Sequence, residues 1–196
     1  MAGPRGEYAK SAMRRAQILD AAFDVFARSG YSASSVNEIA RTVGISQTAV
    51  LHHFSGGKPE LLRAVLEQRD AMAEGALADH HGREFLAELV EISRRQARQR
   101  GVVQLYRILS AEATDPQHPA HEYFRARIER IADAVTHAFS EAQEAGDLKP
   151  GVDPRLAALN ALAMVEGLEM LWLSGLEIDM AESVRRDLNA HLVAPL

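Results

Sequence analysis

Apolar residues recur at helical spacing along nearly the whole chain, and no segment alternates apolar and polar residues as a strand would. Ile18, Ala22 and Phe26 form one such stripe. The pattern predicts helices over residues 11–28, 35–43, 46–53, 59–78, 84–99, 102–113, 120–145, 154–174 and 180–193. The predicted fold class is therefore all-α, with about nine helices.

Capping residues divide the region 35–53 into two short helices joined by a turn. Ser35 fits an N-cap, and Glu38 three residues later would complete a capping box. Gly44 ends the first helix, because the turn there calls for a positive φ angle. Ser46 can cap the second helix, and Phe54 would close it as an apolar plug. The two helices form a predicted helix-turn-helix.

The second of these helices carries polar residues where a buried helix would carry Leu and Val. Base pairs differ in the donors, acceptors and methyl groups that they show in the major groove, so a helix that reads them needs short polar or amide side chains. Gln47 can pair with an adenine edge, Thr48 offers a hydroxyl and a methyl group, and Lys58 suits a phosphate. The predicted DNA-contacting residues are Ser35, Asn37, Ser46, Gln47, Thr48, Ala49, Leu51, His52, His53 and Lys58.

Charge and composition fit this interpretation. Residues 1–58 carry a balance of +3 and residues 59–196 a balance of −8, which together give the net charge of −5. A positive end is typical of a surface that faces nucleic acid. The chain has no cysteine, which excludes disulfides and thiolate metal sites and suits a cytoplasmic protein. No apolar run is expected to reach the roughly 18 residues of a membrane span, and the first residues lack the apolar core of a secretory signal.

The run from Ile18 to Val65 resembles the N-terminal domain of TetR-family transcriptional regulators. The matching features are an Ala-Ala-x-x-x-Phe helix, Gly30-Tyr31 after it, Val36-x-x-Ile39-Ala40, Gly44-Ile45-Ser46 in the turn, His53-Phe54, and Lys58 before Leu61-Leu62. Two features depart from the family pattern: Leu51, His52 and His53 replace the usual aromatic residues, and the loop before Lys58 looks one residue longer.

The resemblance implies a homodimer that binds near-palindromic double-stranded DNA, with two recognition helices in successive major grooves. It also implies a repressor, released by a small ligand bound in the C-terminal domain. The predicted domains are a flexible arm (1–10), a DNA-binding domain (11–58) and a ligand-binding and dimerisation domain (59–196), with helix 59–78 as the link between them.

Helices 154–174 and 180–193 are the predicted dimer interface. The first is apolar nearly all round, and its alanines would let a neighbouring helix come close, as in a four-helix interface built from two helices per subunit. The alternative is that both helices belong to the core of one subunit. The residues predicted at the interface are Ala157, Ala161, Leu168, Leu171, Val184, Leu188 and Leu192.

The ligand site is expected among apolar helix faces that carry a few polar or aromatic exceptions. Trp172 and Tyr106 could stack on a ring, whereas Glu166 and Glu169 are carboxylates on an apolar helix. The alternative for each aromatic residue is plain core, and for each glutamate exposure or pairing with an arginine such as Arg107. The candidates are Phe85, Leu89, Tyr106, Leu109, Phe124, Met164, Glu166, Glu169 and Trp172.

Other chemistry finds little support in the sequence. His80-His81 and His118-x-x-His121 have spacings that could bind a metal, but loop histidines in water explain them better, so neither a metal nor a cofactor is predicted. No nucleophile–base pair or phosphate loop indicates an enzyme. Two other functions stay open: a DNA-binding regulator without a small ligand, and a helical ligand-binding protein whose N-terminal domain has lost DNA binding.

Overall fold

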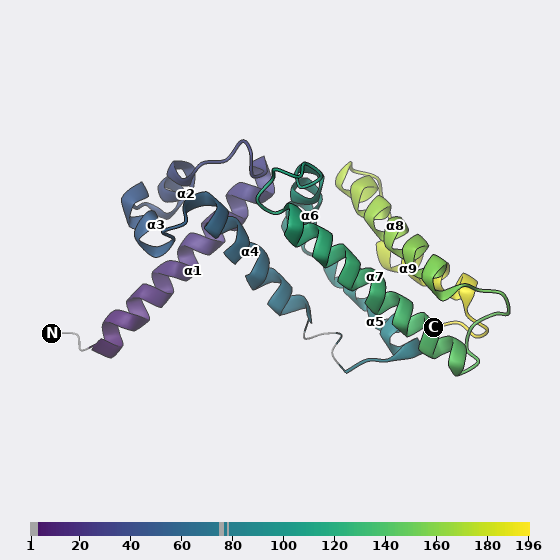
Figure 1. Cartoon of the computed structure of the whole chain (residues 1–196). Coiled ribbons are helices and arrows are strands. Elements are labelled where there is room, and N and C mark those ends of the chain that lie inside the picture. Colours follow the sequence, from purple (N-terminus) through teal and green to yellow (C-terminus); the bar gives the residue numbers. More distant parts are fainter. Residues whose placement is uncertain (1–3, 75–76, 78) are drawn as a thin grey trace. The chain divides into compact units, whose positions relative to one another are not determined.

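The computed structural model describes residues 4–74, 77 and 79–196, and these residues contain nine α-helices (Figure 1). The helices are α1 (Pro4–Ser29), α2 (Val36–Val43), α3 (Gln47–His53), α4 (Gly57–Glu74), α5 (Gly82–Gln96), α6 (Arg100–Glu112), α7 (His121–Glu144), α8 (Pro154–Leu173) and α9 (Met180–His191). The described residues form no strand, only an isolated bridge between Leu148 and Leu192. The all-α prediction is confirmed.

The chain divides into two compact units. The first, here called the head unit, comprises Met1–Met72 and Ile108–His121, and the second, the body unit, comprises Ala73–Arg107 and Glu122–Leu196. The division therefore falls inside α6 and near the end of α4, not at residue 58 as the sequence analysis placed it.

The head unit has its own apolar core. Phe26 of α1, Ile39 of α2 and Phe54 after α3 are fully buried. Leu62 and Leu66 of α4 are buried to 1% exposure. These side chains lie at helical spacing on α4, so its apolar stripe completes the core that α1–α3 begin. Helix α4 is thus a packed element of the head unit, and its assignment to the ligand-binding domain is corrected.

Two predicted boundaries also change. Helix α1 begins at Pro4, so most of the arm predicted over residues 1–10 is helical. No glycine-rich or proline break separates residues 7–10 from the amphipathic helix that follows, and proline is tolerated in a first turn. Helix α4 covers Gly57–Glu74, whereas the prediction was 59–78. Residues 75, 76 and 78 of that prediction lie outside the described part of the chain.

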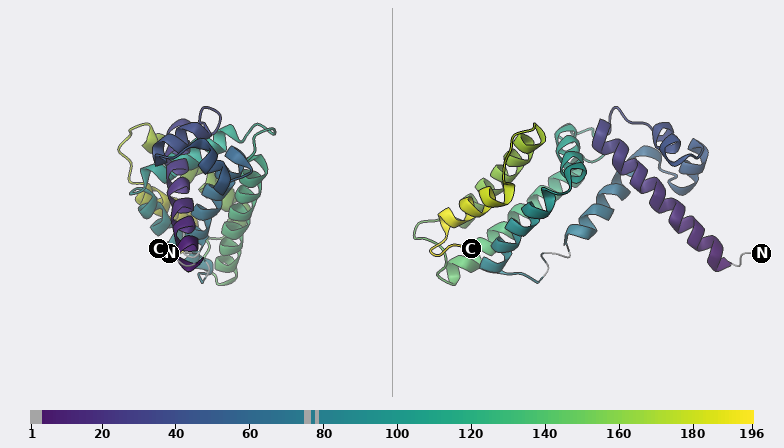
Figure 2. Two further views of the ribbon diagram at one scale, coloured as in Figure 1. Left: turned by 90° about the vertical axis from the view of Figure 1, so that its left-hand side faces the viewer. Right: turned by 180° about the vertical axis from the view of Figure 1, so that it is seen from behind.

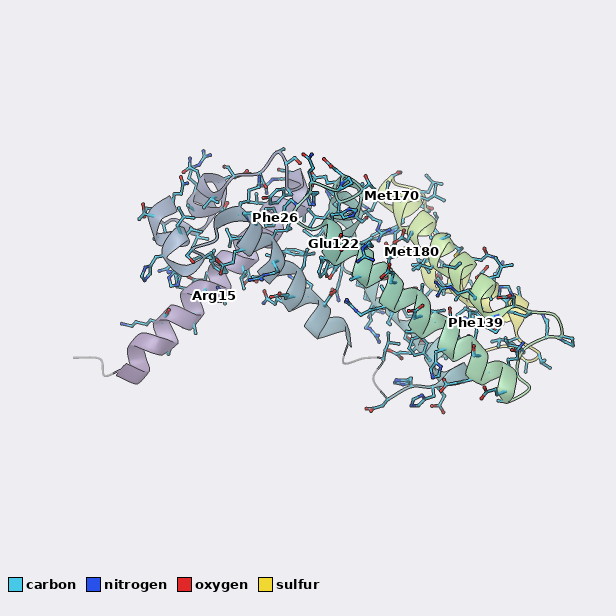
Figure 3. The ribbon with its side chains drawn as sticks, viewed as in Figure 1. Arg15, Phe26, Glu122, Phe139, Met170 and Met180 are labelled. Atoms are coloured by element: carbon cyan, nitrogen blue, oxygen red, sulfur yellow. The ribbon has the colours of Figure 1, made fainter. Side chains whose placement is uncertain are left out.

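The body unit is built around four helices that lie side by side: α5, α7, α8 and α9 (Figures 1 and 2). Phe139 of α7 and Leu86 of α5 are fully buried at the centre of this bundle, together with Leu188 of α9 (Phe139 is labelled in Figure 3). Alanines of α8 complete the core because their small side chains allow close approach to α9. Asp153 and Asp179 cap α8 and α9 through their side chains.

Helix α8 has two apolar faces with different environments. Ala157, Ala158 and Ala161 are buried inside the bundle. Leu156, Leu159, Met170 and Leu171 lie on the other side and are between 43% and 58% exposed. This second row, here called the outer face of α8, leaves large apolar side chains in contact with water, which is typical of a surface that a partner covers.

Most residues of the predicted dimer interface are buried within this chain, so that prediction is corrected. Ala157, Ala161, Val184, Leu188 and Leu192 are buried in the core of this chain, so they cannot meet a second subunit. Leu168 is half-buried against the same core, and Leu171 alone of the predicted set is exposed. The sequence pattern could not separate the two faces, because α8 is apolar nearly all round. Only the structure shows that its alanines face the core and its larger residues face water.

By length and composition, α8 is the only helix in the described part of the chain that is long and apolar enough to cross a membrane. The prediction concerned uninterrupted apolar runs, and Asn160, Glu166 and Glu169 interrupt this helix. Its alanine face packs against α9 within the bundle, which is how a core or interface helix of a globular protein satisfies the same criterion.

Candidate DNA-binding site

The helix-turn-helix forms as its capping residues predict. Ser35 Oγ accepts a hydrogen bond from Glu38 N (3.1 Å), and Ser46 Oγ accepts one from Ala49 N (3.1 Å). Gly44 has φ 75° and ψ 34°, the left-handed conformation that lets Ile45 N bond back to Ala40 O at 3.0 Å. The predicted capping box is half formed: the Glu38 carboxylate pairs with Arg28 (2.9 Å) and not with the backbone N–H of Ser35.

Helix α3 shows one buried and one exposed side. Val50 is fully buried, whereas Gln47, Thr48 and His52 are exposed and Leu51 is half-buried. Positions 47, 48, 51 and 52 share one face of a helix, so they form a continuous polar surface with one leucine. Of the other predicted DNA-contacting residues, Ser35, Asn37 and Ser46 are exposed, and Ala49 and His53 are half-buried. We call positions 47, 48, 51 and 52 the recognition face.

Helix α1 fixes the end of α3. The guanidinium of Arg15 lies 4.1 Å from the centre of the Phe54 ring and donates from Nη1 to the carbonyl oxygen of His53 (3.3 Å). Figure 3 labels Arg15 on α1, on the same helix as the buried Phe26. An arginine over an aromatic face, with a carbonyl at a helix end, stabilises that end. Arg15 was not predictable from the sequence, because nothing in its spacing connects it to residue 54.

Lys58 is held inside the head unit. Its Nζ donates to Ser34 O (2.7 Å) and lies 4.2 Å from the centre of the Tyr31 ring. Burial lowers the pKa of Lys58, and the nearby carboxylate of Glu112 raises it. These contacts tie α4 to the segment before α2. The ammonium group of Lys58 therefore has a structural role in the head unit, and its predicted contact with a DNA phosphate stays a prediction.

Glu112 binds the turn between α1 and α2. Its Oε2 accepts a hydrogen bond from Tyr31 N (2.6 Å), and its Oε1 accepts one from Ser32 N (3.0 Å). The carboxylate fits there because residue 30 is glycine: a Cβ at Gly30 would lie 2.8 Å from Glu112 Oε1. Hydrogen bonds from two N–H groups to one carboxylate are stronger than neutral ones. We call this arrangement the Glu112 clamp.

His118 packs behind the Glu112 clamp. Its ring meets that of Tyr31 edge to face with centroids 5.0 Å apart, and its Nδ1 accepts from Ala120 N (3.2 Å). Since Nδ1 accepts, the neutral ring carries its proton on Nε2, which lies 4.0 Å from Glu112 Oε2. Burial lowers the pKa of His118, and the charges of Glu112 and Asp115 partly oppose this. The uncharged imidazole is the form that this packing favours.

The structure places the predicted ligand residues in several environments. Leu109 belongs to the head unit and the other eight to the body unit. Phe85 is buried in the bundle core, and Leu89 and Met164 pack against it. Tyr106 and Phe124 meet edge to face at 6.3 Å, with the Arg127 guanidinium 4.5 Å from the Tyr106 ring. Trp172 lines an open cavity apart from these residues.

Both candidate glutamates pair with an arginine. Arg107 reaches Glu166 at 2.9 Å and Glu169 at 3.0 Å, and both Arg107 and Glu169 are nearly enclosed. Burial raises the pKa of Glu169, and the Arg107 guanidinium works in the opposite direction. The pairing that the sequence analysis kept as an alternative is thus confirmed. Truncating Arg107 would remove this partner from the buried carboxylate of Glu169, which is costly.

Three of the histidines have local partners, whereas His80 Nδ1 is buried without a hydrogen-bond partner. His81 Nδ1 and His137 Nε2 each lie 3.3 Å from Glu141 Oε1, and His121 Nδ1 lies 2.8 Å from Ala113 O. Glu141 also accepts from Gly82 N (2.7 Å), and this bond is the main reason that its pKa is lowered. Across the described ranges, no three histidine or acidic side chains are arranged to hold a metal ion.

Comparisons with known proteins agree with this geometry. The family model "Bacterial regulatory proteins, tetR family" matches residues 18–65, and the model "AefR-like transcriptional repressor, C-terminal domain" matches residues 84–193, more than half of the chain. The match to the HTH-type transcriptional regulator SrpR of Pseudomonas putida is 46% identical but spans 55 residues, 28% of this chain and 25% of SrpR.

Two further matches span both units. The HTH-type transcriptional regulator TtgR of Pseudomonas putida is 26% identical over 169 residues, covering 81% of this chain and 80% of TtgR. The SmeT–triclosan complex, whose protein is the repressor of a Stenotrophomonas maltophilia multidrug efflux pump, superposes with a TM-score of 0.77 at 21% identity. That superposition covers 93% of this chain and 95% of SmeT, and it shows a shared fold.

The Glu112 clamp predicts a stability difference between two glycines of the head unit. Gly30 (φ 72°) and Gly44 (φ 75°) both adopt a left-handed conformation, but only at Gly30 would a Cβ collide with Glu112. Gly44→Ala should lower the free energy of unfolding by about 1 kcal/mol. Gly30→Ala should cost about 2 kcal/mol more, because the carboxylate must leave its two N–H donors. Denaturant unfolding followed by circular dichroism measures both.

A Glu112→Ala background provides the control. There the collision is gone, so Gly30→Ala should cost no more than Gly44→Ala. Equal costs of Gly30→Ala in the two backgrounds would show that Glu112 does not constrain the turn.

His118 predicts a loss of stability in acid. A base whose pKa is lowered by folding contributes stability above its ordinary pKa of 6.5, and this contribution is lost as the pH falls below that value. Protonation of Nδ1 also removes the acceptor of Ala120 N. His118→Phe keeps a ring against Tyr31, so its unfolding free energy should depend less steeply on pH than that of the wild type. His52→Phe, at an exposed site, is the control, and identical pH slopes for all three proteins would refute the role of His118.

Proposed function

Since the chain belongs to the TetR family of DNA-binding transcriptional regulators, we propose that it is a homodimeric repressor of a near-palindromic operator, released by a small ligand bound in the body unit. The observation that carries the DNA-binding part is the recognition face of α3. Gln47 and Thr48 are exposed there, while Val50 and Phe54 on the opposite side are fully buried. A helix that reads base edges needs such exposed amide and hydroxyl groups beside a buried face that fixes its position.

Base contacts and phosphate contacts are assigned to different residues, with the base contacts on the recognition face. Gln47 can make two hydrogen bonds to an adenine edge, a pair worth about 1–3 kcal/mol of discrimination when its geometry is good. The Thr48 methyl group can contact the methyl group of thymine. Phosphate contacts come from groups around it. Arg41 is exposed, and no carboxylate lies within 4.0 Å of it in the described residues, so it is available for a phosphate. Ser35 and Asn37, at the start of α2, are the other residues proposed to contact phosphates.

The outer face of α8 is the proposed dimer surface. Its four large apolar residues, Leu156, Leu159, Met170 and Leu171, run along about four turns of the helix. A twofold axis would bring this row against the same row of a second copy, because an isologous interface pairs a surface with itself. Two α8 helices and their α9 partners then form a four-helix interface. Dimerisation also supplies the two recognition helices that a near-palindromic operator needs, about 34–36 Å apart.

Release by a ligand requires a difference in affinity between two arrangements of the protein. A ligand that favours the arrangement unable to bind DNA weakens operator binding, with a coupling of about 1–3 kcal/mol in typical cases. The AefR-like repressor model over residues 84–193 supports a repressor. The triclosan complex of SmeT, which shares the fold, supports a small ligand in the body unit. The matched relatives are transcriptional regulators and not enzymes, and a cytoplasmic location fits a protein that binds chromosomal DNA.

Gln47 and Thr48 carry the first prediction. Selection of genomic fragments bound by the purified protein should enrich a motif with two inverted half-sites. Replacement of both residues by alanine should reduce the preference for that motif over random DNA by at least tenfold, while salt-dependent binding to random DNA persists. Gln99→Ala, an exposed amide of the body unit, is the matched control. An unchanged preference in the double variant would exclude these residues as the reading pair.

The outer face of α8 carries the second prediction. Leu159→Asp combined with Met170→Asp would bury charges at the interface, so sedimentation should show a monomer at concentrations where the wild type is a dimer. Val193→Asp alters an apolar residue that is 61% exposed but lies outside α8, and it should leave the dimer intact. A wild-type monomer at micromolar concentration would contradict the proposal, as would a dimer that survives both charges.

A further inference from the structure

The body unit has an open cavity of about 700 Å³ at the end of the bundle where α5 ends and α6 begins. The segment between α8 and α9 forms its other side. Only one of the predicted ligand residues, Trp172, lies there. The lining residues are Arg94, Ala97, Arg100, Trp172, Gly175, Leu176, Glu177, Ile178, Asp179, Met180 and Ala181.

One side of the cavity is apolar and open to water. Met180 and Ala181 are buried, at 3% and 5% exposure, and Trp172 is half-buried. Leu176 in the connecting segment is 51% exposed, although a leucine at this position gains nothing from water. The combination of a closed floor, an indole face and an exposed leucine is a surface that an apolar ring could cover.

The other side holds a fixed positive charge. Arg100 donates from Nη2 to Leu173 O (2.6 Å), and its guanidinium lies 5.2 Å from the centre of the Trp172 ring. No carboxylate lies within 4.0 Å of Arg100 in the described part of the chain, whereas Arg94 pairs with Glu91. The guanidinium is therefore oriented by a carbonyl and a ring, with N–H donors left over for an anion.

The two acidic residues of the lining, Asp179 and Glu177, do not pair with the Arg100 guanidinium. Asp179 Oδ1 accepts from Glu182 N (2.9 Å) as the N-cap of α9, so its carboxylate is committed to the helix. Glu177 is exposed in the connecting segment. A cationic ligand is disfavoured at the indole face, because the Arg100 guanidinium already occupies that environment.

We propose that this cavity binds a small aromatic carboxylate. Its carboxylate accepts hydrogen bonds from the guanidinium of Arg100, and its ring covers Trp172 and Leu176. Because the arginine is already oriented, little side-chain entropy is lost on binding. This inference rests on the proposed function in one respect, since it gives the small ligand of the repressor a place and a chemical class.

Trp172 is the only tryptophan of the chain, so its fluorescence reports on this cavity alone. Phenylacetate titrated into the full-length protein without DNA should change the emission saturably. Phenylacetamide, the uncharged analogue, should bind at least about tenfold more weakly, because it lacks the charge that strengthens the bonds to Arg100. The indole N–H resonance in an NMR titration provides a second signal that does not depend on quenching.

Two variants locate the carboxylate. Arg100→Gln should weaken phenylacetate binding at least about tenfold. Arg98→Gln removes an exposed arginine two residues away that does not line the cavity, and it should bind like the wild type. Circular dichroism checks that both variants fold. The proposal is overturned if neither signal saturates, if phenylacetamide binds equally well, or if Arg100→Gln and Arg98→Gln behave alike.

The same preparations separate this inference from the proposed function. A protein that binds its selected DNA motif but gives no saturable response to phenylacetate refutes the cavity and leaves DNA binding standing. A protein that binds phenylacetate through Arg100 but shows no DNA preference refutes the repressor and leaves the cavity standing.

Discussion

The position of the helix-turn-helix depends on the two hydrogen bonds that the Glu112 carboxylate accepts at the turn after α1. Tyr31 N and Ser32 N donate at 2.6 and 3.0 Å, and the absent side chain of Gly30 leaves room for the carboxylate. Lys58 fixes the next residues by donating to Ser34 O. Because α2 starts from Ser35 and α3 packs on α2, the recognition face takes its direction from this short segment.

The body unit poses the opposite problem, a surplus of apolar surface. Helix α8 has only its alanine side covered, and each large residue on the other side is about half-exposed, so it gains only about half of the roughly 1.5–3 kcal/mol that full burial of such a side chain provides. The second copy proposed above would recover part of that energy by covering this row. The same composition makes α8 pass as a membrane span, so only the placement of its residues distinguishes the two cases.

Local signals explain which parts of the structure the sequence could predict. Ser35, Ser46 and Asp153 act on backbone groups within three residues, and Gly44 needs only its own φ angle, so the helix ends were predictable. Contacts between distant residues were not. Glu112 lies 81 residues from Tyr31, and Arg15 lies 38 residues from His53. Lys58 matched a family position, but its partners Ser34 and Tyr31 became evident only in the folded head unit.

The sequence by itself determined the helices, their caps, the family and the polar face of α3, because each depends on short-range spacing or on an ordered motif. The tertiary structure alone decided three further matters: that α4 belongs to the head unit, that the alanines of α8 face inward while its larger residues face out, and that Arg100 and Trp172 border one cavity. The physical reason is that burial is shared among elements far apart in the chain. When a helix is apolar on every side, its sequence does not indicate which side its neighbours will cover.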